Sequence, residues 1–439
     1  MNHSLLDASA EAERYIGGLD SRAGDWLAER RRSAVLGIQQ LGLPDRRQER
    51  WRYSGIDGLL DGNFSADWES TDNPLPPLES VMPDGTQAGL LVFVDGSFQA
   101  ELSFVNDTGI QFTSLRAAMA KGDRKVLAAL GSLSGTGRHA FSAINLATMQ
   151  DGAVISVSPG KSIDQPIELL HIATAAAGGR MLRPRHLITL DKGSQASIVE
   201  RHLCLDADGY FNNVVSEILL QEDARLDHQR VQLEGSQAYH LSEVHVQLGA
   251  RANYRAINAA VGARWSRTEI NGGFLAAGAN LDLEGLYLAG DGQLVDFHLD
   301  VVHGVSGCSS RSNFKGIVYG QGRAVFDGRI LVERQAQQSD AHLTNANLML
   351  SRGSEVDTKP QLEILADDVK CSHGTTVGQL DPQAVFYLRS RGLSPSQARR
   401  LLCLGFASEI LEGFGNVSLR GQLADHIQRR VESIDLENV

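Results

Sequence analysis

The chain has 439 residues, of which 42% are apolar and 21% charged; these ordinary globular fractions exclude a fibrous or wholly disordered protein. Its formal net charge of −12 argues against nucleic acid and anionic membranes as partners, because both present negative phosphates. At this length a single compact core usually gives way to two or three structural regions.

Cysteine usage and the first residues predict a cytoplasmic protein. The four cysteines, Cys204, Cys308, Cys371 and Cys403, are widely spaced and form no C-x-x-C pair, so they are too few for a disulfide framework. The opening stretch, MNHSLLDASAEAERYI, has acidic side chains and no apolar segment, which is unlike a secretory signal. No apolar run approaches the ~20 residues needed to span a bilayer.

Residues 1–150 are predicted to form a helical and mixed α/β region. Apolar residues from Trp26 to Leu41 recur at helical spacing, and Gly42 with Pro44 ends that helix. A Pro-rich, acidic stretch from Asp67 to Asp84 indicates a loop or linker.

Two further elements are predicted in this region. Asp95-Gly96 between LLVFV and SFQAELS indicates a β-hairpin, because Asp-Gly suits the positive φ angles of a type I′ turn. A helix follows, capped by Thr113 or Ser114, with an apolar stripe that runs to Leu130.

Residues 151–380 are predicted to form a β-solenoid. A turn of the form apolar-x-x-Gly/Asp-small-x-apolar recurs there, at Gly193, Asp223, Gly249, Gly278, Gly292, Gly322 and Gly353. The intervals are 30, 26, 29, 14, 30 and 31 residues, so the period is near 30 apart from one half-length step. Such a period with strand-like runs is typical of stacked coils. A two-sheet sandwich, the alternative, has turns about every 8–12 residues.

Residues 381–439 are predicted to be helical. Asp381-Pro382 begins one helix, which ends at Gly392, and Ser394-Pro395 begins the next. The second helix is apolar on several sides, which indicates burial against another body. Its apolar residues are Leu401, Leu402, Leu404, Phe406, Ile410 and Leu411. The last helix has a single apolar face, formed by Leu419, Leu423, Ile427, Val431 and Ile434.

Three motifs typical of enzymes are incomplete, so no catalytic residue is assigned and the chain is not expected to be an enzyme. Pro159-Gly160-Lys161-Ser162 lacks the first glycine of a phosphate-binding loop, because Ile155 occupies that position. Gly413-Phe414-Gly415 lacks the third glycine of a dinucleotide fingerprint. Gly304-Val305-Ser306-Gly307-Cys308 lacks the second glycine of a nucleophile elbow.

One segment, DDVKCSHG, combines residue types that bind iron. On a strand, Cys371 and His373 project from the same face, and Lys370 together with the imidazole would favour the thiolate. Thiolate and imidazole are good iron ligands, but two ligands do not complete a cluster site, so others must come from elsewhere in the fold or from a second chain. The alternative, from spacing alone, is a buried cysteine beside an ordinary histidine.

Several stretches are distinctive as whole motifs. They are Val356–Ile364, Ala366–Val377, GRAVFDG at 322–328, FYLRSRG at 386–392, LVFVDGSF at 91–98 and GLPDRRQERWRYS at 42–54. Together they span nearly the whole chain, and they resemble the SufB/SufD family of iron-sulfur cluster assembly proteins. SufB usually carries cysteines early in the chain and a different stretch in place of KCSHGTTVG. Here no cysteine precedes Cys204, so the resemblance is to the SufD branch.

This resemblance implies a right-handed parallel β-helix with helical ends and a scaffold role in cluster assembly. It implies a SufB-like partner, with Cys371 and His373 at the contact between the two subunits and as shared metal ligands. It also implies that C-terminal helices bind a SufC-type ATPase. The residues expected at that contact are Phe386, Tyr387, Leu388, Arg391, Leu401, Leu402 and Phe406.

The resemblance further implies support of iron entry, a transient iron or iron-sulfur cluster in the complex, and a reduced flavin held by the complex, although no flavin fingerprint is present. The isolated chain is a candidate homodimer. Two alternatives stay open, a SufB-like homodimeric scaffold and a β-helix carbohydrate-active enzyme with paired carboxylates in a groove. The lack of an export signal and the apolar C-terminal helices argue against the enzyme.

Overall fold

The computed structural model describes residues 25–66, 77–79, 81–134, 139–207, 209–432 and 434. Most of the predicted loop from Asp67 to Asp84 lies outside these residues. Among the helices that are described, none combines the length and the apolar character needed to cross a membrane.

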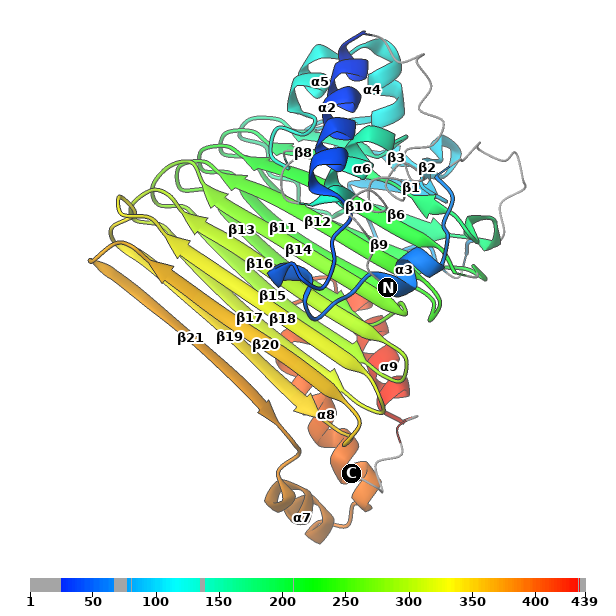
Figure 1. Cartoon of the computed structure of the whole chain (residues 1–439), viewed down its shortest axis with the longest axis vertical. Helices are drawn as coiled ribbons and strands as arrows, with labels where there is room; N and C mark the ends of the chain where they lie inside the picture. Colours follow the sequence, from blue (N-terminus) through cyan, green and yellow to red (C-terminus); the bar gives the residue numbers. More distant parts are fainter. Residues whose placement is uncertain are drawn as a thin grey trace.

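Two long β-sheets make up most of the molecule (Figure 1), and we name each after its last strand. The β21 sheet contains β1 (Gly89–Val94), β2 (Ser97–Phe98), β3 (Phe104–Val105), β6 (Ile167–Ala173), β9 (Gln195–Cys204), β11 (Arg225–Leu233), β13 (Asn253–Ala260), β15 (Asn280–Ala289), β17 (Ser309–Val318), β19 (Ser339–Met349) and β21 (Val369–Gly378). The β20 sheet contains β4 (Ile110–Ser114), β5 (Ala153–Val157), β7 (Met181–Leu182), β8 (Arg185–Leu190), β10 (Phe211–Leu220), β12 (Tyr239–Leu248), β14 (Trp265–Phe274), β16 (Leu294–His303), β18 (Arg323–Val332) and β20 (Glu355–Ile364).

The α-helices come before and after the main run of strands. They are α2 (Asp25–Leu41), α3 (Asp57–Asp61), α4 (Leu115–Lys121), α5 (Arg124–Ala129), α6 (Ala140–Thr148), α7 (Pro382–Ser390), α8 (Pro395–Leu411) and α9 (Val417–Glu432). Three short 3₁₀ turns, η1 (Glu49–Trp51), η2 (Ala100–Leu102) and η3 (Ala175–Ala177), complete the described elements.

From β5 onward the chain alternates between the two sheets, so each coil contributes strands to both. Successive coils pair in parallel, as Phe211 of β10 does with Tyr239 of β12. The predicted parallel solenoid is therefore confirmed. The coil order and the parallel pairing exclude the alternative of a sandwich.

The half-length step in the repeat marks a change of solenoid edge. The turns at Gly193, Asp223, Gly249 and Gly278 lead from the β20 sheet into the β21 sheet, whereas those at Gly292, Gly322 and Gly353 lead back. The 14-residue step from Gly278 to Gly292 is thus one strand and one turn, or half a coil. Gly193, Asp223, Gly278 and Gly292 have φ angles of 67°, 59°, 78° and 71°, which explains the choice of glycine or aspartate at these four turns.

Alternate residues of each strand point into the solenoid and form one apolar cluster along its length. Between β15 and β18 this cluster contains a stack of four aromatic rings with centroids 5.2–5.7 Å apart, Tyr287, Phe297, Phe314 and Phe326. Gly285 makes room for the stack, because a Cβ there would lie 2.3 Å from the Phe314 ring.

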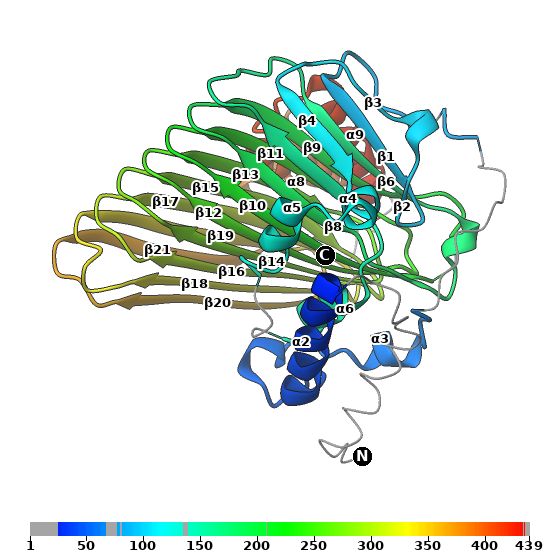
Figure 2. The same ribbon diagram turned by 90° about the horizontal axis from the view of Figure 1, so that it is seen from above.

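N-terminal helices cover the outer face of the β20 sheet (Figure 2). The predicted first helix is confirmed as α2, which packs on α6. Sequence analysis identified no helix at α6, although Ser142, Asn145 and Thr148 recur at helical spacing. Every residue of α6 is buried, and this polar stripe meets the β20 sheet rather than solvent.

The predicted hairpin is confirmed, but the helix after it is not a single element. Asp95 and Gly96 have φ angles of 48° and 79°, and Val94 pairs with Ser97 across the turn. Ser114 caps α4 as predicted. The helix then stops at Gly122, with φ of 66°, and Asp123 caps the separate helix α5.

The C-terminal helices α8 and α9 pack on the outer face of the β21 sheet. The prediction for the last helix is confirmed, since Leu419, Leu423, Ile427 and Val431 are all buried. In α8 the apolar residues divide between two environments. Ile410 and Leu411 are buried with the β21 sheet in the same cluster, whereas Leu401 is 49% exposed.

Candidate functional site

The solenoid is uncapped at its last coil. Among the described strands, β20 pairs only with β18 and β21 only with β19, so each sheet ends in a strand with one unpaired edge (Figure 1). The inward-facing residues of these strands are also uncovered, with Ile364 40% and Val377 46% exposed. Free edges and apolar side chains suit pairing with another chain. We call the surface formed by β20 and β21 the open end.

Cys371 and His373 share the inner face of β21 at the open end. They are in register with Ala341 and Leu343 of β19, which are buried in the solenoid core. Cys371 is half-buried and packs on that core, whereas His373 is exposed. The predicted projection from one face is therefore confirmed.

The prediction that the surroundings of Cys371 favour its thiolate form is wrong. Burial raises the pKa of the Cys371 thiol above its ordinary value, and the nearby Asp340 carboxylate acts in the same direction. Lys370 is exposed and in register with Asp340, and strand alternation directs it to the face opposite Cys371. Within the described ranges no three His, Cys, Asp or Glu side chains converge as a metal site.

The residues expected to bind an ATPase lie on α7, on α8 and between them. Phe386 and Tyr387 are 71% and 56% exposed, and the Arg391 guanidinium lies 5.1 Å from the centre of the Tyr387 ring. Leu388 and Leu402 are partly buried. Phe406 is also partly buried. The Lys315 ammonium group lies over its ring, with the nitrogen 4.7 Å from the ring centre. Helix α7 itself contains no buried residue, so its surface is free for a partner.

The N-terminal motif GLPDRRQERWRYS forms a strap, residues Glu49–Ser54, across the outer face of the β20 sheet. Arg50 contacts Glu269 at 3.3 Å and Asp300 at 3.7 Å. Glu49 pairs with Lys359 of β20, so the strap reaches the last strand of its sheet. It thereby connects the N-terminal region to the open end.

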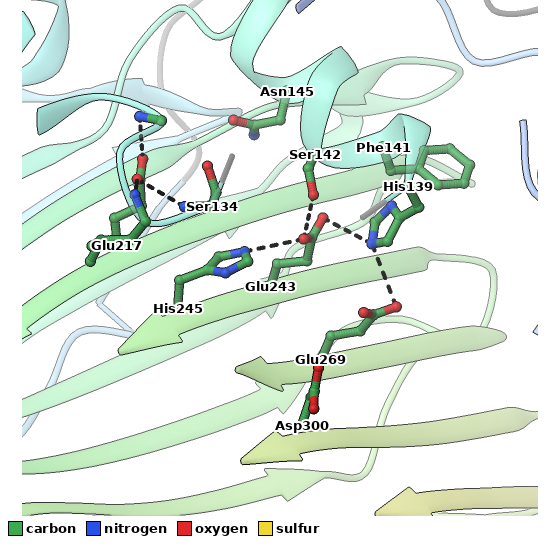
Figure 3. Close-up of polar contacts among 12 residues, drawn as sticks. Ser134, His139, Phe141, Ser142, Asn145, Glu217, Glu243, His245, Glu269 and Asp300 are labelled. Carbon is green, nitrogen blue, oxygen red and sulfur yellow. Dashed lines mark hydrogen bonds and ion pairs between the residues drawn. The ribbon is translucent and has the colours of Figure 1, made fainter. Parts of the chain in front are cut away.

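A buried polar cluster lies where α6 meets β12 and β14 (Figure 3). His139 Nε2 is 3.3 Å from Glu243 and 3.5 Å from Glu269. Ser142 donates a hydrogen bond to Glu243, and His245 contacts the same carboxylate at 3.3 Å. Burial acts to lower the pKa of His139, but the two carboxylates outweigh it and hold the pKa above its usual value. The cluster fastens α6 to the β20 sheet.

A second polar cluster is enclosed inside the first coils. Glu200 accepts hydrogen bonds from His202 at 2.7 Å and Arg230 at 3.2 Å, and it contacts His228 at 3.2 Å. The imidazole of His171 stacks on that of His202 with centroids 4.6 Å apart. Burial, together with neighbouring imidazoles, holds the pKa of His171 well below its usual value.

Sequence reasoning treated these histidines singly and missed both clusters. A signal was present, because His171 and His202 are 31 residues apart, close to the repeat period, and they are in register on neighbouring coils. His240 and His245 of β12 point to opposite faces of the β20 sheet and pair with Glu234 and Glu243, respectively.

Comparisons with known proteins agree with this geometry. Residues 171–406 match the model of the SUF system FeS cluster assembly SufBD core domain, and residues 10–169 match that of the SufBD protein N-terminal region. An iron-sulfur cluster assembly SufBD family protein of Synechocystis is 32% identical, over 98% of this chain and 97% of its own. The iron-sulfur cluster assembly protein SufD of Escherichia coli is 30% identical, over 90% of this chain and 91% of its own. This chain therefore belongs to the SufBD family of iron-sulfur cluster assembly proteins.

Proposed function

We propose that the chain is a scaffold subunit without catalytic activity of its own, which pairs with a SufB-like subunit and a SufC-like ATPase to form nascent clusters and to support iron entry. The observation that carries this proposal is the open end. There, each sheet ends in a strand with an unpaired edge, and one of these strands, β21, carries Cys371 and His373. Cysteine and histidine side chains are donors that iron prefers.

In this proposal the SufB-like subunit completes the site. Iron and sulfide are the cargo, and the exposed His373 supplies an imidazole that can bind iron. Metal binding is the first role that we propose for His373. Proton transfer is the second, and orientation of the interface is the third. Burial and the Asp340 carboxylate raise the pKa of the Cys371 thiol, which disfavours the thiolate that binds metal, so in this proposal Cys371 is the weaker of the two ligands.

The ATPase would bind on α7 and the adjoining part of α8. Phe386, Tyr387 and Leu401 are exposed apolar side chains on neighbouring helices, and surface of this kind is typical of protein contacts. Because α8 also packs on the β21 sheet, a movement of the ATPase would be passed to the solenoid through this helix.

The family assignment supports a scaffold over a carbohydrate-active enzyme. The similarity to a protein named SufD supports the heterodimeric scaffold over a SufB-like homodimer. A cytoplasmic location stays a prediction.

The reduced flavin that the resemblance implies also stays a prediction. A pocket of about 480 Å³ beside β1, β3 and β4 has three phenylalanines, Phe98, Phe104 and Phe112, in its wall. Its one charged lining residue is Asp107, an acid that would repel the phosphate of a flavin nucleotide. The residues there do not fit that group.

Co-purification tests the proposed function. The full-length chain is expressed with a SufB-like chain and a SufC-like ATPase of the same organism, with a tag on this chain alone. We expect all three to elute together, with ATP hydrolysis only when the ATPase is included. Separate elution of the three chains, or robust ATP hydrolysis by this chain alone, contradicts the proposal.

A further inference from the structure

A ladder of polar side chains runs from the interior of the solenoid to the open end, where its last member, Thr358, lies on β20. The Tyr287 hydroxyl in β15 donates a hydrogen bond of 2.6 Å to Asn347 Oδ1 in β19. Asn347 Nδ2 donates to Asn345 Oδ1 at 2.7 Å, and Asn345 Nδ2 donates back to the Tyr287 hydroxyl at 2.9 Å. Thr358 Oγ1 of β20 also donates to Asn345 Oδ1, at 2.9 Å. Each member thus bonds to at least one other member.

The ladder crosses the interior of the solenoid from one sheet to the other. Asn345 and Asn347 belong to the β21 sheet, and Thr358 belongs to the β20 sheet. Tyr287 reaches over β17 only because Gly316 lies between, since a Cβ at Gly316 would lie 2.0 Å from the Tyr287 ring. The arrangement therefore depends on a glycine as well as on the polar side chains.

The position of the ladder relates it to the candidate site. Asn345 is in register with Thr375, and Asn347 with Val377, on the inner face of β21. His373 is two residues before Thr375 on that same face. Tyr287, Asn345 and Asn347 are at most 3% exposed, so their polar groups depend on one another for hydrogen bonds.

A buried polar network stabilises less than apolar packing of the same volume, but it admits fewer arrangements, because any shift leaves donors and acceptors unpaired. Immediately before the ladder the core is filled by the aromatic stack of Phe297, Phe314 and Phe326, which imposes no such constraint on alignment. The solenoid core therefore changes from aromatic rings to hydrogen-bonded side chains near the end of the two sheets.

We propose that the Tyr287–Asn347–Asn345–Thr358 ladder is a positioning element. It bonds β20 to β19, on which β21 pairs, and so holds β20 and β21 at the separation and offset that a partner subunit must match. Thr358 supplies the bond that joins the two sheets. This inference rests on the proposed function, because it requires a partner that binds at the open end. That partner must present two strand edges at once, as a second solenoid does.

Thr358→Val is the test variant, because it removes the hydroxyl at nearly constant shape. We measure the affinity of the full-length chain for a SufB-like chain by calorimetry, and its melting temperature by circular dichroism. We expect affinity to fall about tenfold, the effect of about one lost hydrogen bond, with little change in melting temperature. Thr358→Ser, which keeps the hydroxyl, restores the affinity.

Thr344→Val is the matched control. Thr344 is exposed on the neighbouring strand β19 and bonds to Ser312 and Asn313 rather than across the solenoid, so its loss should leave binding unchanged. Wild-type affinity in Thr358→Val, or weakened binding that Thr358→Ser does not restore, overturns the positioning role.

Amide hydrogen exchange on the chain alone tests the ladder without the partner. Thr358→Val should speed exchange about tenfold in peptides covering 355–364 and 369–378, since β20 loses its bond to β19, the strand on which β21 pairs. Exchange that is unchanged in the second peptide shows that the ladder does not connect the two edges. If the wild-type chain binds no SufB-like chain, the proposed function fails, while the exchange data still decide on the ladder.

Discussion

The Arg267 guanidinium lies against the face of the Trp51 ring, with its central carbon 3.8 Å from the ring centre. Arg267 is fully buried and pairs with Glu269 at 2.7 Å and with Asp296 at 2.6 Å. It also donates hydrogen bonds to the Arg50 carbonyl and to Ser54 Oγ. One side chain of the β20 sheet thus fastens the middle and the end of the strap.

Trp51→Ala should strongly destabilise the protein. Trp51 is 2% exposed, so its truncation loses apolar burial and uncovers Arg267, and we expect the free energy of unfolding to fall by about 3–5 kcal/mol. Chemical denaturation monitored by circular dichroism measures the change. Phe104→Ala, at a ring that is 40% exposed, is the control and should cost well under half as much. Equal losses in both variants contradict the anchoring role of Trp51.

His139→Gln should destabilise the protein most at mildly acidic pH. The folded-state pKa of His139 is raised, so the stability from its positive charge is full below about pH 6.5 and is lost as pH rises through the folded value. Removal of the cation between Glu243 and Glu269 should cost about 3 kcal/mol at pH 6, and the difference from wild type should shrink toward pH 9. Denaturant titrations at both pH values measure it. A difference that grows with pH would show that His139 is not charged in the folded protein.

The enclosed histidines should make the protein sensitive to acid. Burial lowers the pKa of His186 to about 4, so below about pH 6.5 the unfolded chain binds more protons than the folded one. Stability should fall as pH drops from about 6.5 toward 4, by about 2 kcal/mol at pH 5 from His186 alone. His186→Asn should reduce this loss, because an Asn oxygen can accept the Ala153 N–H as His186 Nδ1 does and does not titrate. Identical pH profiles for the variant and the wild type contradict the assignment.

Phe386→Asp combined with Leu401→Asp should abolish ATPase binding without harm to the fold. Both side chains are largely exposed, and charge in place of apolar contact should weaken binding by at least about tenfold. Leu275→Asp is the control, because Leu275 is 58% exposed on a solenoid turn. A pull-down with the ATPase separates the outcomes, and retained binding by the double variant would place the ATPase elsewhere.

Deletion of all the C-terminal helices would test the ATPase contact less clearly than the double variant does. A chain ending at Gly378 would lack α8 and α9, which bury the outer face of the β21 sheet, including Ile257 and Ile317. Their removal would expose that apolar face, and aggregation would then obscure any loss of binding.

His373→Ala should impair cluster formation by the assembled complex while assembly and ATP hydrolysis continue. The exposed imidazole is available to iron or to a proton, whereas Cys371 is half-buried with a raised pKa, so Cys371→Ala should have the smaller effect. Iron and sulfide bound per reconstituted complex measure the result, with His342→Ala, at another partly exposed histidine of the last coils, as control. Wild-type loading in His373→Ala would show that the residue serves only the interface.

Local patterns in the sequence predicted those parts of the fold that depend on neighbouring residues. The turns at Gly193 and Asp223 need positive φ angles, Ser114 and Asp381 cap helices, and strand alternation puts Cys371 and His373 on one face. Each of these features follows from backbone geometry within a few residues.

Only the tertiary structure decided the rest, because it depends on which coils stack on one another. The pKa of Cys371 responds to burial on the core and to Asp340 of the adjacent coil, 31 residues away. Helix α6 is buried on all sides, and only the packing shows that its polar side chains Ser142 and Asn145 meet the β20 sheet and not solvent. The bond from Thr358 to Asn345 spans two sheets. In the same ladder, Tyr287 reaches Asn347 only because Gly316 has no side chain. Sequence spacing identifies the face on which a residue lies, but stacking decides what that face meets.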